Sequence, residues 1–205
     1  MANTPLDLIE VLLDASSMSE GEFIAEHPHP VLVPERVRSG LLARLREGSG
    51  SGTLKLGGRQ PGESAAIASG QLLVLRKTTG QGRLDRFEAG SDKGTWIILG
   101  RQADADVMIN DFSVSQRQAG IRRSGSAFQV QDLGSTNGTS LNGKRLEPNQ
   151  PGPLKSGDQL DLGRVEVTFL VGRDLYRLLA PTVADIGQSM GRAMGGPWGP
   201  EDSTE

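Results

Sequence analysis

The sequence of 205 residues contains no cysteine, and aromatic residues make up only 4% of it. The lack of cysteine excludes disulfide bonds and thiolate zinc sites. It is consistent with a protein that works in a reducing compartment. Few aromatic residues together with 28 glycines favour a fold with many tight turns and an aliphatic core.

A strong charge imbalance and long apolar runs are also missing. The chain has 22 Lys and Arg against 25 Asp and Glu, for a formal net charge of −3. Proteins that bind nucleic acid usually carry a basic excess, so a general nucleic-acid binder is disfavoured. No run of about 18 apolar residues is present, and we expect no membrane insertion. The first residues show no signal-peptide pattern, and the expected location is the cytoplasm.

From about residue 68 the sequence consists of short β-like runs that are separated by turn residues. Asn142-Gly143 predicts a type I′ hairpin turn, because both of its central positions need positive φ. Short runs at this spacing, without helical patterns between them, predict an all-β fold: an antiparallel β-sandwich of about ten to eleven strands with short helical flanking segments. The expected strands are residues 71–78, 84–89, 95–100, 106–109, 118–123, 127–132, 139–142, 144–146, 158–162 and 165–170.

Helical patterns flank this β-rich region. Thr4 is expected to cap a first helix, and a second helix is expected to begin near Pro34 and to stop at Gly48. Prolines between these helices favour extended chain. The apolar stripes of the two helices are expected to be Leu6, Ile9, Leu12 and Leu13, and Val37, Leu41, Leu42 and Leu45.

The expected organisation has five parts. The helices are expected to dock on the sandwich, and self-association or contact with an assembly is the alternative. The parts are a helical or irregular segment (1–48), a linker rich in Gly and Ser (49–67), the β-sandwich domain (68–173), a helical segment (174–195) and a disordered tail (196–205).

Three loop motifs carry the chemistry of this sequence. Gly100-Arg101 ends the apolar strand TWIIL, and a loop with the order Ser-Gln-Arg-Gln follows at 115–118. The third motif is Ser-Thr-Asn-Gly-Thr at 135–139. In this order the motifs resemble the forkhead-associated (FHA) domain family, whose pattern is Gly-Arg, then Ser-x-x-His, then an Asn-Gly turn. The resemblance covers roughly residues 68–173, about half of the chain.

The resemblance implies an FHA/SMAD-like sandwich that binds phosphothreonine peptides. Arg101 would place its guanidinium on the phosphate, and the hydroxyl of Ser115 would donate to it. The backbone of Gln116 and the side chain of Thr136 would add contacts, while Asn137 would bind the main chain of the peptide. Three further residues would support these loops: Gly100, Gln118 and Gly138.

Three features of the same loops bear on how the peptide would be bound. Gln118 stands where the family usually has histidine, so the resemblance implies that Gln118→His stabilises the loop. Ser113 occupies a position that in some relatives helps to read the third residue after the phosphothreonine, and its small polar side chain implies little charge selection there. Lys144 and Arg145 could form a basic rim, although such residues at exposed strand ends often serve only solubility.

The leading interpretation is an adaptor in Ser/Thr kinase signalling that captures a threonine-phosphorylated partner, either a kinase or its substrate. The alternative is a phosphate-independent structural scaffold or assembly module. An enzyme is disfavoured because the sequence has no cysteine, no nucleophile elbow and no P-loop. Its two histidines, His27 and His29, lie outside the β-rich domain and lack acidic or thiol partners for a metal. We expect neither a metal nor a cofactor.

Overall fold

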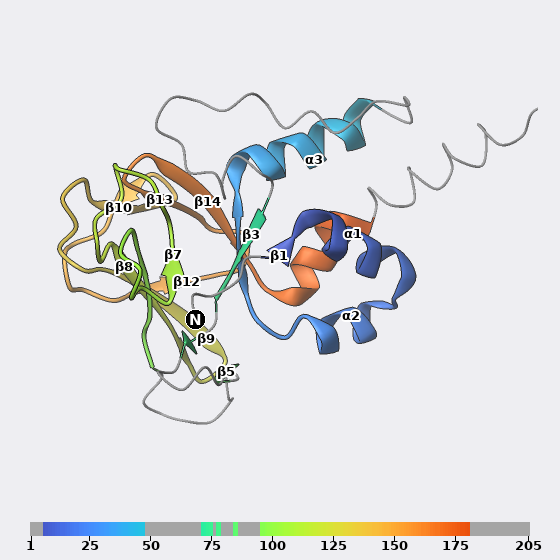
Figure 1. The fold of residues 1–205 in the computed structure, drawn as a ribbon, viewed down its shortest axis with the longest axis horizontal. Coiled ribbons are helices and arrows are strands. Elements are labelled where there is room, and N and C mark those ends of the chain that lie inside the picture. The colour runs from blue at the N-terminus through green and yellow to red at the C-terminus, as the bar shows by residue number, and fades with distance from the viewer. Residues whose placement is uncertain (1–5, 48–70, 76, 79–83, 86–94, 181–205) are drawn as a thin grey trace, which may run out of the picture.

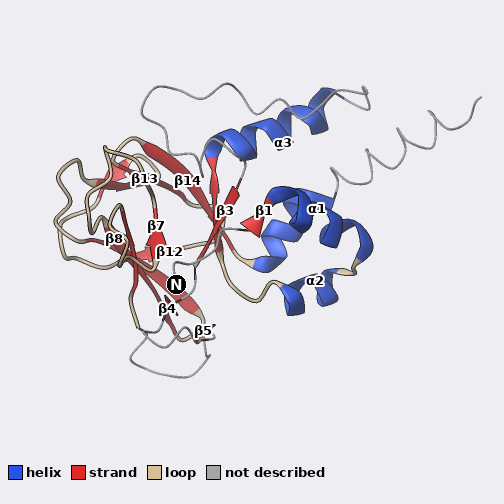
Figure 2. Ribbon diagram, in the orientation of Figure 1, coloured by secondary structure: helices blue, strands red, loops and turns tan. Residues whose placement is uncertain are grey.

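The computed structural model describes residues 6–47, 71–75, 77–78, 84–85 and 95–180. Two β-sheets pack against each other, and the helices gather beside one of them (Figures 1 and 2). The predicted β-sandwich with helical flanks is therefore confirmed. No helix in the described ranges is both long and apolar enough to cross a membrane.

The larger sheet contains seven strands in the order β1-β3-β2-β14-β13-β10-β11, and all of its pairs are antiparallel. Both residues of the predicted Asn142-Gly143 turn have positive φ, 51° and 76°, which confirms the hairpin between β10 and β11. The strands are β1 (Leu6–Asp7), β2 (Val31–Pro34), β3 (Gln71–Val74), β10 (Thr139–Leu141), β11 (Lys144–Arg145), β13 (Gln159–Leu162) and β14 (Val165–Leu170).

The second sheet has the order β12-β9-β8-β6-β7, and its pair β6–β7 is parallel. Two further short strands, β4 (Lys77–Thr78) and β5 (Leu84–Asp85), pair with each other. Among these strands, β12 was not expected, because Gly-Pro-Leu carries no β pattern. The strands of the second sheet are β6 (Ile97–Gly100), β7 (Val107–Met108), β8 (Ala119–Ser124), β9 (Ala127–Asp132) and β12 (Gly152–Leu154).

The core between the two sheets is mainly aliphatic, as the composition predicted. Phe169 and Phe128 contribute an edge-on ring contact, with centroids 5.1 Å apart. Most other members are Leu, Val and Ile from alternate positions of the strands, as expected for two sheets that bury one face each. Fully buried examples are Leu32, Leu99, Ile121, Leu160 and Leu162.

Strand β2 lies inside the larger sheet, although it precedes the β-rich region that the sequence predicted. It pairs with β14 on one side and with β3 on the other. Leu32 enters the core between the sheets, while Val31 and Val33 are buried beneath the helices. The sheet is thus not confined to residues 68–173. The signal was weak because a run buried on both faces shows no alternation.

The first helix, α1 (Leu8–Ser17), begins later than predicted. Asp7 caps it by accepting a hydrogen bond from the N–H of Ile9 at 2.7 Å, whereas Thr4 lies outside the described residues. The expected apolar stripe is wrong, since Ile9 and Leu13 are 67% and 62% exposed. Leu6 pairs in β1, and the helix instead buries Leu8, Val11 and Ala15.

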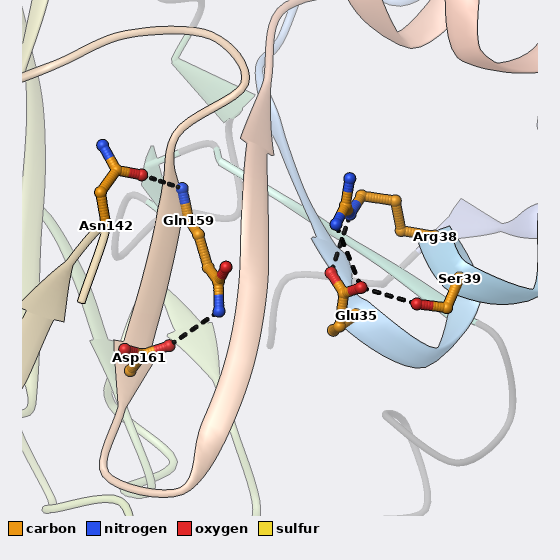
Figure 3. Close-up of polar contacts among 6 residues, drawn as sticks. All are labelled: Glu35, Arg38, Ser39, Asn142, Gln159 and Asp161. Carbon is orange, nitrogen blue, oxygen red and sulfur yellow. Dashed lines mark hydrogen bonds and ion pairs between the residues drawn. The ribbon is translucent and has the colours of Figure 1, made fainter. Parts of the chain in front are cut away.

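A second helix, α2 (Glu20–Glu26), was missed in a segment expected to be extended. Ser19 and Glu22 form a reciprocal capping box, a Ser-x-x-Glu signal that the sequence does contain. The backbone and side-chain hydrogen bonds from Ser19 lower the pKa of Glu22. The helix α3 (Glu35–Glu47) follows Pro34 as predicted, and Glu35 accepts hydrogen bonds from Arg38 and Ser39 in its first turn (Figure 3).

Residues 172–180 form a further helix, which begins two residues before the segment 174–195 that the sequence predicts to be helical. The described helices share one hydrophobic cluster with the outer side of the larger sheet, so they dock on the sandwich. The expected linker, the rest of the C-terminal helical segment and the tail lie outside the described residues. The cluster includes Phe23, Val37, Leu41, Leu175 and Leu179.

Candidate functional site

The Gly100-Arg101 motif lies where β6 ends, against the loop that precedes β8. The N–H of Arg101 donates to the carbonyl of Ser115 at 2.9 Å. A Cβ atom on Gly100 would overlap the carbonyl of Gln116, so only glycine permits this close approach. The end of β6 and the loop therefore form one rigid unit, from which Arg101 extends as an exposed side chain.

Ser115 and Thr136 come from loops far apart in the sequence and lie in contact. The N–H of Thr136 donates to Oγ of Ser115 at 2.9 Å. The Ser115 hydroxyl in turn donates to Oγ1 of Thr136 at 3.3 Å. Ser115 is half-buried and Thr136 is exposed, so two hydroxyls meet at the surface.

Asn137 is exposed and joins the same two loops. Its Nδ2 donates to the carbonyl of Ser113 at 2.8 Å, which leaves Oδ1 and the second N–H of the amide unused within the described part of the chain. Gly138 follows with φ of 83°, a conformation that strains other residues.

Gln118 is fully buried beneath both loops and forms hydrogen bonds with polar groups on each of them. Its Oε1 accepts from the N–H of Ser115 at 2.8 Å. Its Nε2 lies within hydrogen-bonding distance of Oγ of Ser135 (2.9 Å), the carbonyl of Gly138 (2.8 Å) and Oγ1 of Thr139 (3.1 Å). This side chain therefore links the loop of Ser115 to the loop of Asn137.

The sequence did not reveal the role of Asp132, which is 1% exposed. Its carboxylate accepts from the N–H groups of Gly134 and Ser135 and from the hydroxyls of Ser135 and Thr139, at 2.6 to 3.0 Å. An Asp two residues before a Gly is a recognisable Asx-turn signal. With Gln118, this carboxylate fixes the conformation of the loop that presents Thr136 and Asn137.

Ser113 is buried and does not face the surface. It is 4% exposed, and its hydroxyl donates to Asp111 at 2.6 Å and accepts from the N–H of Arg164 at 3.0 Å. The exposed neighbour in this loop is Phe112, whose ring lies under the guanidinium of Arg164, 4.5 Å from the ring centroid.

The exposed donors of the site are free to bind a ligand. Within the described part of the chain, neither the guanidinium of Arg101 nor the N–H of Gln116 has a hydrogen-bonding partner. Together with the hydroxyls of Ser115 and Thr136, they provide a cation and neutral donors of the kind that phosphate oxygens accept from. The arrangement is suited to hold an anion.

The two histidines of the sequence lie away from these loops. Nε2 of His27 lies 2.9 Å from Oδ2 of Asp14, so it joins α1 to the end of α2. The described residues contain no group of three or more His, Cys, Asp or Glu that could hold a metal.

A comparison with protein-family models matches residues 97–163 to the FHA domain. The chain is also 32% identical over 137 residues to an oxoglutarate dehydrogenase inhibitor of Corynebacterium diphtheriae, a match that covers 66% of this chain and 85% of the relative. The chain belongs to the FHA domain family. The matched part of the FHA domain contains all three loop motifs.

Other relatives of this FHA protein are described as regulators. The glycogen accumulation regulator GarA of Mycobacterium tuberculosis is 27% identical over 170 residues, which cover 80% of this chain and 83% of the relative. The oxoglutarate dehydrogenase inhibitor of Corynebacterium jeikeium is 40% identical, but its 73 matched residues span only 49% of its length and 36% of this chain. The names of these relatives describe inhibitors and a regulator.

Among solved structures, one described as a structural and functional analysis of phosphothreonine-dependent FHA domain interactions is 35% identical. The match covers 44% of this chain and 86% of that chain, with a TM-score of 0.34.

Proposed function

We propose that this FHA domain captures partner proteins through a phosphorylated threonine and acts as an adaptor in Ser/Thr kinase signalling. The observation that carries the proposal is that hydrogen bonds hold together three segments, those of Arg101, of Ser115 with Gln116, and of Thr136. The guanidinium of Arg101 and the N–H of Gln116 are unpaired in the described part of the chain. The partner would be a kinase or one of its substrates, in the cytoplasm.

Each donor matches one demand of a phosphate ligand. Phosphothreonine carries close to two negative charges and three acceptor oxygens. Arg101 supplies a permanent positive charge and a planar fork of N–H groups. Ser115, Thr136 and the N–H of Gln116 add donors on loops that hydrogen bonds already hold in place, and the Ser115 hydroxyl has only to rotate away from Thr136 to reach the ligand.

Asn137 is suited to a different part of the ligand. An amide offers both a donor and an acceptor, which is what the main chain of an extended peptide needs. The hydrogen bond from Nδ2 to Ser113 fixes the orientation of this amide. The site contains no histidine or cysteine, and it would therefore hold the phosphate without transferring it.

The test is a fluorescence anisotropy titration with pairs of peptides that differ only in threonine phosphorylation. We expect binding of the phosphorylated member alone. Arg101→Ala should weaken it by about 2–3 kcal/mol, roughly 30- to 150-fold, because a charge-assisted contact is lost. Arg122→Ala is the matched control: this arginine lies over Trp96 on the outer face of the second sheet, 4.6 Å from the ring centroid. Equal binding of both peptides would contradict the proposal.

The alternative is a phosphate-independent assembly module, and the exposed Ile9 and Leu13 on α1 favour it as a second candidate. A pull-down from the native lysate, with wild type and Arg101→Ala as the immobilised proteins, distinguishes the two functions. Partners that wild type and Arg101→Ala capture equally, and that phosphatase treatment does not remove, would support the assembly module. The relatives named for oxoglutarate dehydrogenase make that enzyme one partner to look for.

A further inference from the structure

Arg145 of strand β11 lies directly against the turn that presents Asn137. A Cβ atom built on Gly138 would meet the guanidinium of Arg145, with its Nη2 at 2.5 Å and its Nε at 2.8 Å. The guanidinium therefore covers the exposed side of the Asn137-Gly138 turn. The amide of Asn137 itself is held by the carbonyl of Ser113, from the preceding loop.

The orientation of Arg145 is not explained by a hydrogen-bonding or ionic partner among the residues that the structure describes. Across the sheet, Arg145 pairs with Ser140, and Ser140 pairs with Asp161 on the other side. Paired residues share one face of a sheet, and strands two places apart lie about 10 Å from each other. Asp161 is thus the nearest acid in this row, yet it accepts a hydrogen bond from Nε2 of Gln159 instead, at 3.3 Å (Figure 3).

No carboxylate in the described ranges forms an ion pair with Arg145, and the side chain is exposed. An arginine that serves only solubility usually extends into water or pairs with a neighbouring acid. The guanidinium of Arg145 lies against Gly138, and the residue before Gly138, Asn137, is expected to bind a peptide. Its fork of N–H groups remains available for an anion.

We propose that Arg145 is a second anion-binding residue of this site and selects peptides that carry a carboxylate close to the phosphothreonine. The inference rests on the proposed function, since it requires that a peptide lies along Asn137. Side chains of residues next to the phosphothreonine would then pass the guanidinium of Arg145. A Glu or Asp side chain matches that fork in charge and in geometry.

The expected strength follows from the exposure of Arg145. Exposed ion pairs contribute about 0.2–1 kcal/mol, which corresponds to a preference of up to about 5-fold for the acidic peptide. Salt screens such pairs, with a Debye length of about 8 Å at physiological ionic strength, so the preference should shrink as salt is added. A direct phosphate contact, by comparison, is expected to decide whether binding occurs at all.

The test uses the full chain and a set of phosphothreonine peptides in which each position within three residues of the phosphothreonine is either Glu or Gln. Wild type should prefer Glu about 2- to 5-fold at one position at least. Arg145→Gln should abolish this preference, and Arg145→Lys should retain part of it because the charge remains. Lys144→Gln is the matched control, since the adjacent side chain of the same strand points to the other face.

The outcomes separate this inference from the proposed function. If no phosphorylated peptide binds, the proposed function fails and Arg145 has no ligand to select. If phosphorylated peptides bind and wild type shows no Glu preference at any position, the inference about Arg145 is wrong while the proposed function stands. An equal loss of preference in Lys144→Gln would also overturn it, because the effect would then reflect general charge.

Discussion

Replacement of Gln118 by histidine, the residue that the family usually has there, tests the buried link between the two binding loops. The amide of Gln118 accepts from the N–H of Ser115 and lies within donor distance of three acceptors, among them the carbonyl of Gly138. A neutral imidazole provides one donor and one acceptor in a fixed plane. The contacts of the structure therefore reverse the direction that the resemblance alone implied, and we expect Gln118→His to destabilise the protein.

The magnitude follows from the groups that lose their partner. An unsatisfied buried donor or acceptor costs about 1–3 kcal/mol, and at least one of the groups on Ser115, Ser135 or Gly138 would be left without its present bond. For a chain of this size, about 1–3 kcal/mol lowers the melting temperature by roughly 2–12 °C. The affinity for phosphothreonine peptides should fall as well, because Ser115 and Asn137 depend on this link.

Differential scanning calorimetry and anisotropy titration measure the two effects. Gln131→His is the matched control, as Gln131 is half-buried on β9 and its side chain forms no hydrogen bond in the described part of the chain. A melting temperature at or above that of wild type, with unchanged affinity, would refute the reasoning. It would mean that the loops can rearrange around an imidazole without cost.

Two further substitutions test the core and the turn. Leu32→Ala should destabilise the protein by about 2–5 kcal/mol in denaturant unfolding, because the side chain is fully buried between the sheets. The control is Leu13→Ala, which should have little effect because Leu13 is exposed. Equal losses of stability in the two variants would show that β2 is not part of the core. Gly138→Ala should cost about 1–3 kcal/mol through its φ of 83° and should also displace Arg145 and weaken the Glu preference. Gly134→Ala is its control, with φ of 75° but open space around the glycine; it should keep the Glu preference, and the same loss there would argue against the contact with Arg145.

The sandwich was predictable from the sequence because its signals are local. Asn142-Gly143 specifies its hairpin through backbone conformation alone, and β8, β9 and β14 read as strands within a residue or so of their observed limits. Pro34 likewise fixed the start of α3. In each case, neighbouring residues determine the outcome without help from the rest of the chain.

The features that were missed depend on distant parts of the chain. Strand β2 is a strand because β3 and β14 offer free edges on both sides, and nothing in its four residues states this. The face of α1 that is buried depends on where the sheet lies, so the spacing of its apolar residues predicts the wrong side for Ile9 and Leu13. The helix α2 is the exception, because the capping box of Ser19 and Glu22 is a local signal.

The loop motifs named the residues of the site, but the sequence did not show what holds them together. Arg101, Ser115 and Asn137 are exposed or half-buried, so packing against the core does not fix their positions. Their positions are fixed by buried polar groups, chiefly Gln118 and Asp132, which form hydrogen bonds with the backbone and side chains of the loops. Because a half-satisfied buried network is costly, these two residues tolerate change less well than the exposed residues above them. The guanidinium of Arg101 forms no hydrogen bond in the described part of the chain, so a protein that needed the sandwich only as a scaffold would lose no such contact without it. Binding to phosphate, not folding, is therefore the property that this guanidinium serves under the proposed function.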